Sequence, residues 1–318
     1  MTKINLKKYI KIMVITFLSI TSITIMNTNP HKAYAFPVYA QQGYENPREA
    51  TGRIVCANCH LAQKPISIEL PKSILPNSIF EAKVLIPYDI NQKQLLGSGT
   101  EGELNTGAVL VLPEGFKLAP KNLLSEEIKN KTKNIYIQPY STSKENILLV
   151  GPVPGNNQEL IFPILSPDPT KDKNVHFFKY PIYVGGNRGR GQIYPTGDKS
   201  NNNPITSSTS GKIVKIHSNE KGGYEVDIIN KNGETTTQII PKGLKLLIEE
   251  GNKVSVNQNL TNDPNIGGFG QSETEIVLQS PTRIKNMIAF FIVVTITQIF
   301  FVLKKKQWEK VQAADMNF

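Results

Sequence analysis

Short apolar runs separated by turn residues dominate the middle of the chain. They are rich in Val, Ile, Phe and Tyr, and Pro, Gly and Asn lie between them, which is typical of β-strands. The clearest runs are 79–86, 109–112, 147–150, 160–165 and 175–184. A short amphipathic stretch, 123–133, predicts a single helix. The pattern predicts an all-β fold of many strands, of the kind found in sandwiches.

A smaller all-β unit is predicted after residue 203. The segment 196–212 is dense in Asn, Ser, Thr and Gly and predicts a linker. The strand candidates behind it are 213–216, 224–229, 238–240, 244–248 and 273–279, with turns at 221–223 and 232–233 and a loop at 262–272. We interpret 204–264 as a small domain inserted into a large one, which comprises 36–203 and is completed by 265–284. Two domains strictly in tandem are the alternative.

Two longer apolar segments lie near the ends of the chain. The first follows four lysines and ends at Ala33-Tyr34-Ala35, which predicts a signal peptide over 1–35; an N-terminal membrane anchor is the alternative. The second, 287–303, is 17 residues long and is followed at once by three lysines. It predicts a transmembrane helix over 285–303, with the tail 304–318 on the side of synthesis. A buried core helix is the alternative, but lysines are rarely buried.

The basic charge of the chain comes mostly from these end segments. The formal net charge is +10, yet five lysines in 1–35 and a net +2 in 304–318 account for seven of the ten charges. Residues 36–286, which we expect to be exported, therefore keep only a small positive charge. The basic balance of the chain therefore does not indicate nucleic-acid binding, which would need a basic stripe on the folded domain, and no nucleic-acid partner is expected.

The two cysteines of the chain lie in the sequence Cys56-Ala57-Asn58-Cys59-His60. C-x-x-C-H is the attachment motif of c-type heme, in which both thiols form thioethers and the histidine binds iron. A thioredoxin-like redox site would need a βαβ context, and a structural zinc site would need four ligands. We predict one covalently bound heme c, with Cys56 and Cys59 as thioether donors and His60 as an axial ligand.

The second axial ligand is restricted by the positions of the other donor residues. No methionine lies between residues 36 and 286, so methionine ligation in the exported domain is excluded. We interpret His176 as a packed or hydrogen-bonded strand residue and His217 as a solvated turn residue. A lysine amine, the α-amine that cleavage creates at Phe36, and an open site remain. The α-amine has a reference pKa of about 8 against about 10.4 for lysine, which favours the chain terminus.

Five segments of the chain resemble the cytochrome f family: 44–60, 162–169, 179–195, 265–271 and 304–312. The resemblance runs from the predicted cleavage site to the C-terminus. It implies a large immunoglobulin-like sandwich that carries the heme, an inserted small β-barrel-like domain and one C-terminal transmembrane helix. It also implies that the Phe36 α-amine is the second iron ligand and that Pro37 packs beside the heme. Tyr39 stands where the family usually has Phe or Trp.

The resemblance implies two further sets of residues. An internal chain of waters would be held by Gln94, Asn187, Gln192, Asn202 and Asn265. The alternative is that these amides bind their own loop backbone. Lys93 and Lys221 match a lysine patch that steers an acidic electron carrier, although solvated lysines are the plainer interpretation. Thr100 and Glu101 stand where two lysines are usual, so we expect weaker steering.

The function implied by the resemblance is one-electron transfer in photosynthesis, in which this subunit makes and breaks no substrate bond. It would be an electron-transfer subunit of a plastoquinol–plastocyanin oxidoreductase, the cytochrome b6f complex, beside cytochrome b6, the Rieske iron–sulfur protein and subunit IV. The electron would pass from the Rieske protein to plastocyanin or to the soluble cytochrome c6. The chain would cross the thylakoid membrane of a plastid once, with the heme domain in the lumen. A heme sensor or peroxidase, and a purely structural β-subunit, are the competing classes.

Overall fold

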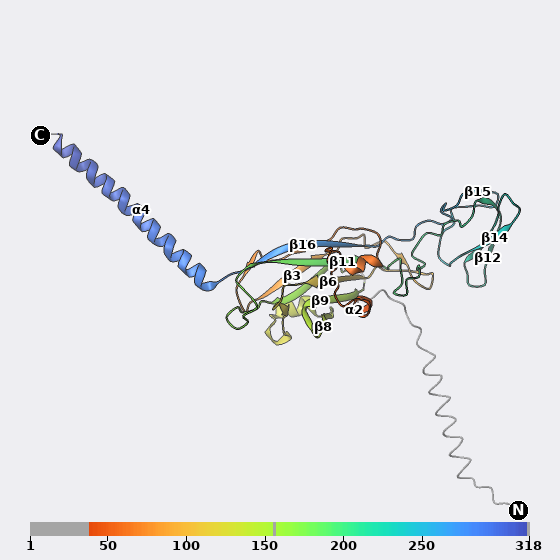
Figure 1. The fold of residues 1–318 in the computed structure, drawn as a ribbon, viewed down its shortest axis with the longest axis horizontal. Coiled ribbons are helices and arrows are strands. Elements are labelled where there is room, and N and C mark those ends of the chain that lie inside the picture. The colour runs from red at the N-terminus through yellow and green to blue at the C-terminus, as the bar shows by residue number, and fades with distance from the viewer. Residues whose placement is uncertain (1–37, 155–156, 317–318) are drawn as a thin grey trace, which may run out of the picture. The chain divides into compact units, whose positions relative to one another are not determined.

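The computed structural model describes residues 38–154 and 157–316 of the chain. Within these ranges strands predominate and one long helix stands at the C-terminal end (Figure 1). The all-β prediction with a single C-terminal apolar helix is therefore confirmed. The predicted signal peptide and the two residues Phe36 and Pro37 lie outside the described residues.

One four-stranded antiparallel sheet contains two of the predicted strands, and burial alternates with period two along one of them. Along β3 every second side chain is buried, and Ala82 faces Phe162 of β10 across the sheet. This alternation places one face of the sheet against a core. The strands, in spatial order, are β1 (Ser67–Glu69), β3 (Ile79–Leu85), β10 (Glu159–Leu165) and β7 (Lys117–Leu118).

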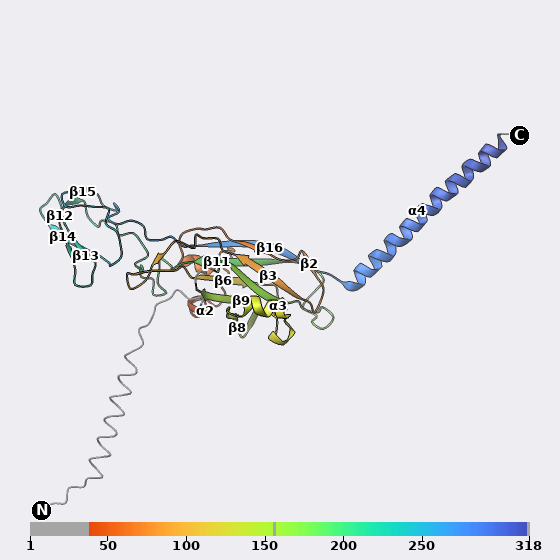
Figure 2. The ribbon, with the colours of Figure 1, turned by 180° about the vertical axis from the view of Figure 1, so that it is seen from behind.

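A second sheet has six strands and packs against the first (Figure 2). All neighbouring strands in it are antiparallel except β2 and β16, which run parallel. The two sheets share one apolar core, to which Phe162, Leu110 and Ile182 contribute fully buried side chains. In spatial order the strands are β2 (Ser73–Ile74), β16 (Gly268–Leu278), β11 (Lys179–Arg188), β6 (Thr106–Val111), β9 (Lys144–Val153) and β8 (Ile137–Ser141).

A third sheet has four strands and its own apolar core. Its turns contain Gly222 and Gly233 at φ of 78° and 84°, a conformation that glycine adopts without strain. Leu95 packs into this core although it belongs to the two-stranded pair of β4 (Gln94–Leu95) and β5 (Glu101–Gly102). The spatial order is β14 (Thr235–Ile240), β13 (Tyr224–Ile229), β12 (Gly211–Ser218) and β15 (Lys253–Val254). These strands fall between β11 and β16 in sequence; the domain boundaries at 203/204 and 264/265 stay predictions.

Three expectations about local structure are wrong. The segment 244–248 forms no strand, because Leu244 and Ile248 enter the small core from irregular backbone. The predicted linker 196–212 is packed, since its polar side chains bind backbone groups; the Ser200 hydroxyl, for example, donates to the Gly191 carbonyl at 2.8 Å. The predicted loop 262–272 ends early, because β16 already begins at Gly268.

Neither His176 nor His217 lies where the sequence placed it. His176 precedes β11 and is exposed; its backbone amide and carbonyl bind the Tyr180 hydroxyl, both at 2.9 Å. His217 lies on β12, and its Nε2 is 3.1 Å from a carboxylate oxygen of Glu225. The apolar neighbours of His176 in sequence suggested a strand, but the strand starts three residues later at Lys179.

The helices are few. The predicted stretch 123–133 contains α3 (Glu126–Thr132), whose N-cap Ser125 accepts a hydrogen bond from the Ile128 amide. Among the described residues, α4 is the one helix long and apolar enough to cross a membrane, and it includes the predicted segment 285–303. The described helices are α2 (Val38–Gly43), η1 (Val55–Asn58), η2 (Lys121–Leu123), α3 and α4 (Pro281–Asp315).

Candidate functional site

The C-x-x-C-H sequence forms one tight turn. Its first residues make the 3-10 helix η1, and the amides of Cys59 and His60 both donate to the Cys56 carbonyl, at 3.2 and 3.0 Å. Both cysteines are free and partly exposed. Burial raises the pKa of the Cys56 thiol to about 12 and also raises that of Cys59, so both sulfurs carry their protons. The turn therefore presents two neutral thiols and one imidazole from five consecutive residues.

The His60 imidazole is buried without good hydrogen-bond partners. Its side chain is 6 % exposed, Nδ1 has no partner, and Nε2 is 3.3 Å from the Asn187 side-chain nitrogen. Burial lowers the pKa of His60 to about 4, which keeps the ring neutral. Neutral imidazole is the form that binds metals, and a buried ring nitrogen normally has a partner. The residues present thus fit a heme iron bound at His60.

The loop that follows β11 holds the turn from one side. The amides of Gln192 and Ile193 donate to the Cys59 carbonyl at 2.7 and 3.3 Å. The Gln192 side-chain oxygen accepts from the Leu61 amide at 2.9 Å. Gly191 allows this contact, because a β-carbon built there would lie 3.0 Å from the Cys59 carbonyl oxygen.

The strand β16 holds the other side of the turn. The side-chain oxygen of Gln271 accepts from the Ile54 amide at 3.0 Å, and its nitrogen donates to the Gly52 carbonyl at 3.1 Å. The turn also rests on an apolar cluster, with Cys56 and Ala57 packed against it. The buried members of this cluster are Ile54, Val109, Tyr140, Ile147, Leu149 and Phe269.

The helix α2 is fixed to the same cluster through Tyr140. The Tyr140 hydroxyl donates to the carbonyls of Ala40 and Tyr44, at 2.6 and 2.5 Å. In return the Gln41 side chain donates to the Tyr140 carbonyl at 2.8 Å. Burial raises the pKa of Tyr140 to about 12, so the hydroxyl keeps its proton and stays a donor. Tyr39 lies on this helix, half-buried, and the helix begins two residues after Phe36.

We expect Tyr140→Phe to destabilise the protein by about 0.5–1.5 kcal/mol, because the carbonyls of Ala40 and Tyr44 lose the hydroxyl that binds both of them. The free energy of unfolding of the full chain, measured by urea titration, checks this. Tyr136→Phe is the matched control, since Tyr136 is 77 % exposed. Equal unfolding midpoints for the two variants would show that α2 is not held through this hydroxyl.

The five predicted water-chain amides lie around His60 and the backbone of Arg190. Asn187 contacts the His60 ring, as described above. Gln94 accepts from the Arg190 amide at 2.7 Å, while Asn202 and Gln192 donate to its carbonyl at 2.9 and 3.4 Å. Asn202 is also 3.4 Å from the side-chain oxygen of Asn265. Gln94, Gln192 and Asn202 thus bind backbone groups, as the alternative interpretation expects, whereas Asn187 does not. The side-chain oxygen of Asn202 is buried and has no partner.

The predicted docking residues are all exposed. Lys93 lies one residue before β4, and Lys221 lies in the turn between β12 and β13. A third lysine, Lys242, was missed by the sequence analysis. A β-carbon built on Gly222 would lie 3.4 Å from its Cδ, and one built on Gly99 would lie 2.9 Å from its Cβ. Lys242 is thus adjacent to both Lys221 and Thr100. It lies in irregular backbone, so no pattern in the sequence could have predicted this proximity.

Two arginines were also missed. Arg190 donates to the Leu95 carbonyl at 2.8 Å and to the Asn201 side-chain oxygen at 2.7 Å, which joins β4 to the loop after β11. Arg188 is almost fully buried and donates to the carbonyl of Pro65, in the segment after His60, at 2.5 Å. Burial lowers the pKa of Arg188 to about 10, so it stays charged at neutral pH. Both lie in the glycine- and arginine-rich segment 185–191, whose composition is the only signal for them.

Comparison with known proteins gives matches over almost the whole chain. Residues 36–189 match the family "Apocytochrome F, N-terminal" and residues 201–318 match "Apocytochrome F, C-terminal". The chain is 71 % identical over 310 residues to cytochrome f of Gracilaria tenuistipitata var. liui, covering 97 % of this chain and 99 % of the relative. It is 66 % identical to that of Porphyra purpurea, covering 95 % and 94 %. For Chlorokybus atmophyticus the identity is 58 %, covering 100 % and 99 %.

Proposed function

The chain belongs to the cytochrome f family, and on this premise we propose that it is a membrane-anchored c-type cytochrome that passes single electrons from the Rieske iron–sulfur protein to plastocyanin or cytochrome c6. The family membership by itself establishes the coarser statement: a heme-containing electron-transfer subunit of the photosynthetic cytochrome b6f complex. The donor, the acceptor and the neighbouring subunits cytochrome b6 and subunit IV belong to the proposal.

One observation carries the proposal: a buried, neutral His60 with an unpartnered nitrogen follows directly on two free thiols in a single turn. Cys56 and Cys59 would each add a thiol across a heme vinyl group, so that a carbon–sulfur bond forms and the thiol hydrogen passes to the neighbouring vinyl carbon. His60 would bind the iron on one face. When bound, the heme supplies a one-electron couple of its iron.

The second axial ligand in this proposal is the α-amine of Phe36, with Pro37 beside the heme. Its support is the absence of methionine from residues 36–286 and the anchoring of α2, two residues further on, to Tyr140. Two fixed protein ligands change little between oxidation states, and this suits rapid electron transfer. The apolar cluster covers one side of the turn and would limit the access of water to this ligand set.

Docking of the acceptor is proposed at the exposed lysines Lys93 and Lys221, together with Lys242. Positive charge steers an acidic partner and raises the association rate. Thr100 and Glu101 lie in the same region. Because threonine is uncharged and glutamate is negative, this surface is less positive than one with lysines at both positions. This composition supports a weakly steered or less acidic acceptor.

A proton path is proposed along the five amides. A buried acceptor without a partner normally binds an ordered water, and the side-chain oxygen of Asn202 is such an acceptor. Gln94, Asn187, Gln192 and Asn265 would hold further waters between them.

The topology proposed for the chain follows from α4. The lysines at 304–306 mark the side of synthesis, so the heme domain would lie in the thylakoid lumen of a plastid and the tail 304–318 in the stroma. The predicted signal peptide over 1–35 would direct this export and would create the Phe36 terminus by its removal.

Carbon monoxide tests the proposal against its competitors, a heme sensor or a peroxidase. We expect the reduced protein to keep its absorption spectrum under carbon monoxide, because both axial positions are taken by the protein. Protein unfolded in guanidinium, in which an axial ligand is released, serves as the reactive control. A spectral shift of the folded protein would favour a sensor or peroxidase, and a chain without heme would favour a structural subunit.

A further inference from the structure

Three large apolar side chains are exposed in two loops of the six-stranded sheet. Leu75 is 46 % exposed, Phe177 39 % and Phe178 64 %. We name these three residues the apolar rim. Leu75 directly follows β2 and the two phenylalanines directly precede β11, so the rim belongs to the two strands that flank β16. Exposed aromatic and aliphatic side chains that cluster in this way usually mark a contact surface.

Hydrogen bonds tie the rim to the last residues of β16. The Leu278 amide donates to the Phe178 carbonyl at 2.9 Å, and the Gln279 amide donates to the Ile74 carbonyl at 2.8 Å. The helix α4 begins at Pro281, three residues after Leu278. The rim is therefore held at the end of the sandwich from which the chain enters α4, whatever direction the helix takes.

The length of chain between the rim and the bilayer is short. Three extended residues from Leu278 to Pro281 span at most about 10 Å. The helical segment from Pro281 to Met287, where the apolar run starts, rises about 9 Å. The headgroup layer on each side of the hydrocarbon core is about 5–8 Å thick. With α4 upright, Pro281 lies at the outer surface of the headgroups, and Leu278, which is hydrogen-bonded to Phe178, lies at most about 10 Å from Pro281.

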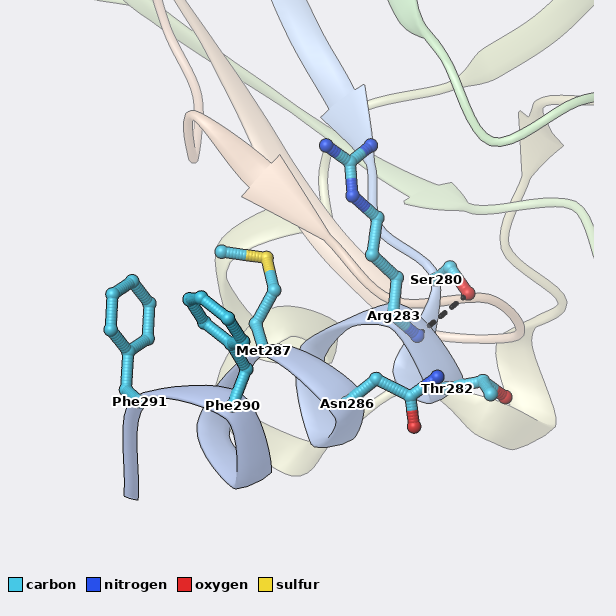
Figure 3. A pocket seen from close by; sticks show the side chains of 7 residues that line it. All are labelled: Ser280, Thr282, Arg283, Asn286, Met287, Phe290 and Phe291. Atoms are coloured by element: carbon cyan, nitrogen blue, oxygen red, sulfur yellow. Dashed lines mark hydrogen bonds between the residues drawn. The ribbon is translucent and has the colours of Figure 1, made fainter. Parts of the chain in front are cut away.

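The first turns of α4 show where the polarity changes (Figure 3). An open hollow of about 630 Å³ is lined by polar residues up to Asn286 and by Met287, Phe290 and Phe291 beyond it. Ser280 caps this end, since its hydroxyl accepts from the Arg283 amide at 3.3 Å. The boundary of the bilayer's hydrocarbon core therefore falls near Met287.

The rim is part of ordered loops. The Ser166 hydroxyl donates to the Leu75 carbonyl at 2.7 Å, and the ring of Phe178 packs edge-on against Tyr180 at 5.9 Å between centroids. Exposed lysines lie in the same loop as the two phenylalanines, at 171 and 173, and directly before β2, at 72; Lys171 is 3.9 Å from a carboxylate oxygen of Asp168. Apolar side chains combined with lysines are typical of segments that lie in a membrane interface, where the rings enter the headgroup boundary and the lysines contact lipid phosphate or sulfate.

We propose that Leu75, Phe177 and Phe178 insert into the headgroup region of the bilayer that α4 crosses. The sandwich then has two attachments to the membrane, one covalent through α4 and one through the rim. Two attachments restrict the tilt of the heme domain, whereas the short link at 279–280 alone would let it swing. The proposal rests on α4 crossing the membrane and is independent of the heme ligands.

Spin labelling of the full-length, heme-loaded chain in lipid vesicles tests this. A nitroxide is attached at Phe178→Cys or, in a separate variant, at Leu75→Cys. The label would react only at the introduced cysteine, because Cys56 and Cys59 would be bound to the heme as thioethers. Ile239→Cys on β14 is the matched control, as Ile239 is also 64 % exposed and belongs to a different sheet. For each label we compare its accessibility to oxygen with its accessibility to a water-soluble nickel reagent. We expect the ratio of oxygen to nickel accessibility to be several-fold higher at residues 178 and 75 than at residue 239.

Two results would overturn the proposal. Equal accessibility ratios at 178 and 239 would show that the rim stays in water. Labels at 178 and 75 that are accessible to nickel in vesicles, but shielded from both reagents in the assembled complex, would show that another subunit covers the rim. The heme spectrum, recorded on the same samples, separates either result from a failure of the proposed electron-transfer function.

Discussion

Replacing Cys56 and Cys59 together by serine is expected to abolish covalent heme attachment completely. A serine hydroxyl cannot take the place of a thiol in forming a thioether, so the variant chain should show no heme stain on a denaturing gel. The wild-type chain should keep its stain under the same conditions. Ala57→Ser is the matched control, since it places a hydroxyl in the same turn and leaves both thiols in place.

The single variants add information on how the two thiols share the attachment. Each of Cys56→Ser and Cys59→Ser keeps one thiol and should retain a stain with reduced yield. The core between the two large sheets does not include the turn, so the double variant should still form the sandwich. A heme stain that survives in the double variant would show that another side chain makes the covalent bond, and the proposed roles of both cysteines would then be wrong.

Most of the sandwich could be predicted from the sequence, because its strands are short apolar runs bounded by turn residues. β3 and β10 were placed to within one residue; side chains alternate between buried and half-buried along β3, whereas β10 is buried continuously over 160–164. The first half of β16 was missed. Its residues Gly268 and Gly270 have no side chain to show a pattern, and only their pairing with β11 makes them a strand.

In the candidate site, too, some residues could be predicted from the sequence and others could not. The turn at 56–60 was identified as a candidate site of heme attachment because its thiols and imidazole lie within five consecutive residues. The amides Gln94 and Asn202 meet at Arg190 from positions that are distant in sequence, so their grouping came from the family resemblance. Tyr140 and Gln271 gave no signal at all. Their role depends on which loops the strands bring beside them, and spacing along the chain does not contain that information.

Blocking signal removal is expected to open the heme iron. With Ala33→Leu and Ala35→Leu, the small residues that the peptidase requires are lost and the chain keeps residues 1–35. The nitrogen of Phe36 then stays in a peptide bond, where its lone pair is delocalised and cannot bind iron. The reduced variant should bind carbon monoxide nearly fully, against no binding in the wild type. Absorption spectra with and without the gas measure this, and N-terminal sequencing verifies the retained leader.

Phe36→Ala separates the amine from its side chain. This variant keeps a free α-amine with a reference pKa of about 8, of which a useful fraction is unprotonated near neutral pH. It should therefore remain closed to carbon monoxide although it lacks the aromatic ring. If instead the uncleaved variant also ignores the gas, an interior side chain such as a lysine occupies the sixth position. Because the described residues contain no methionine before Met287, that result would direct the search to the lysines near α2 and the apolar cluster.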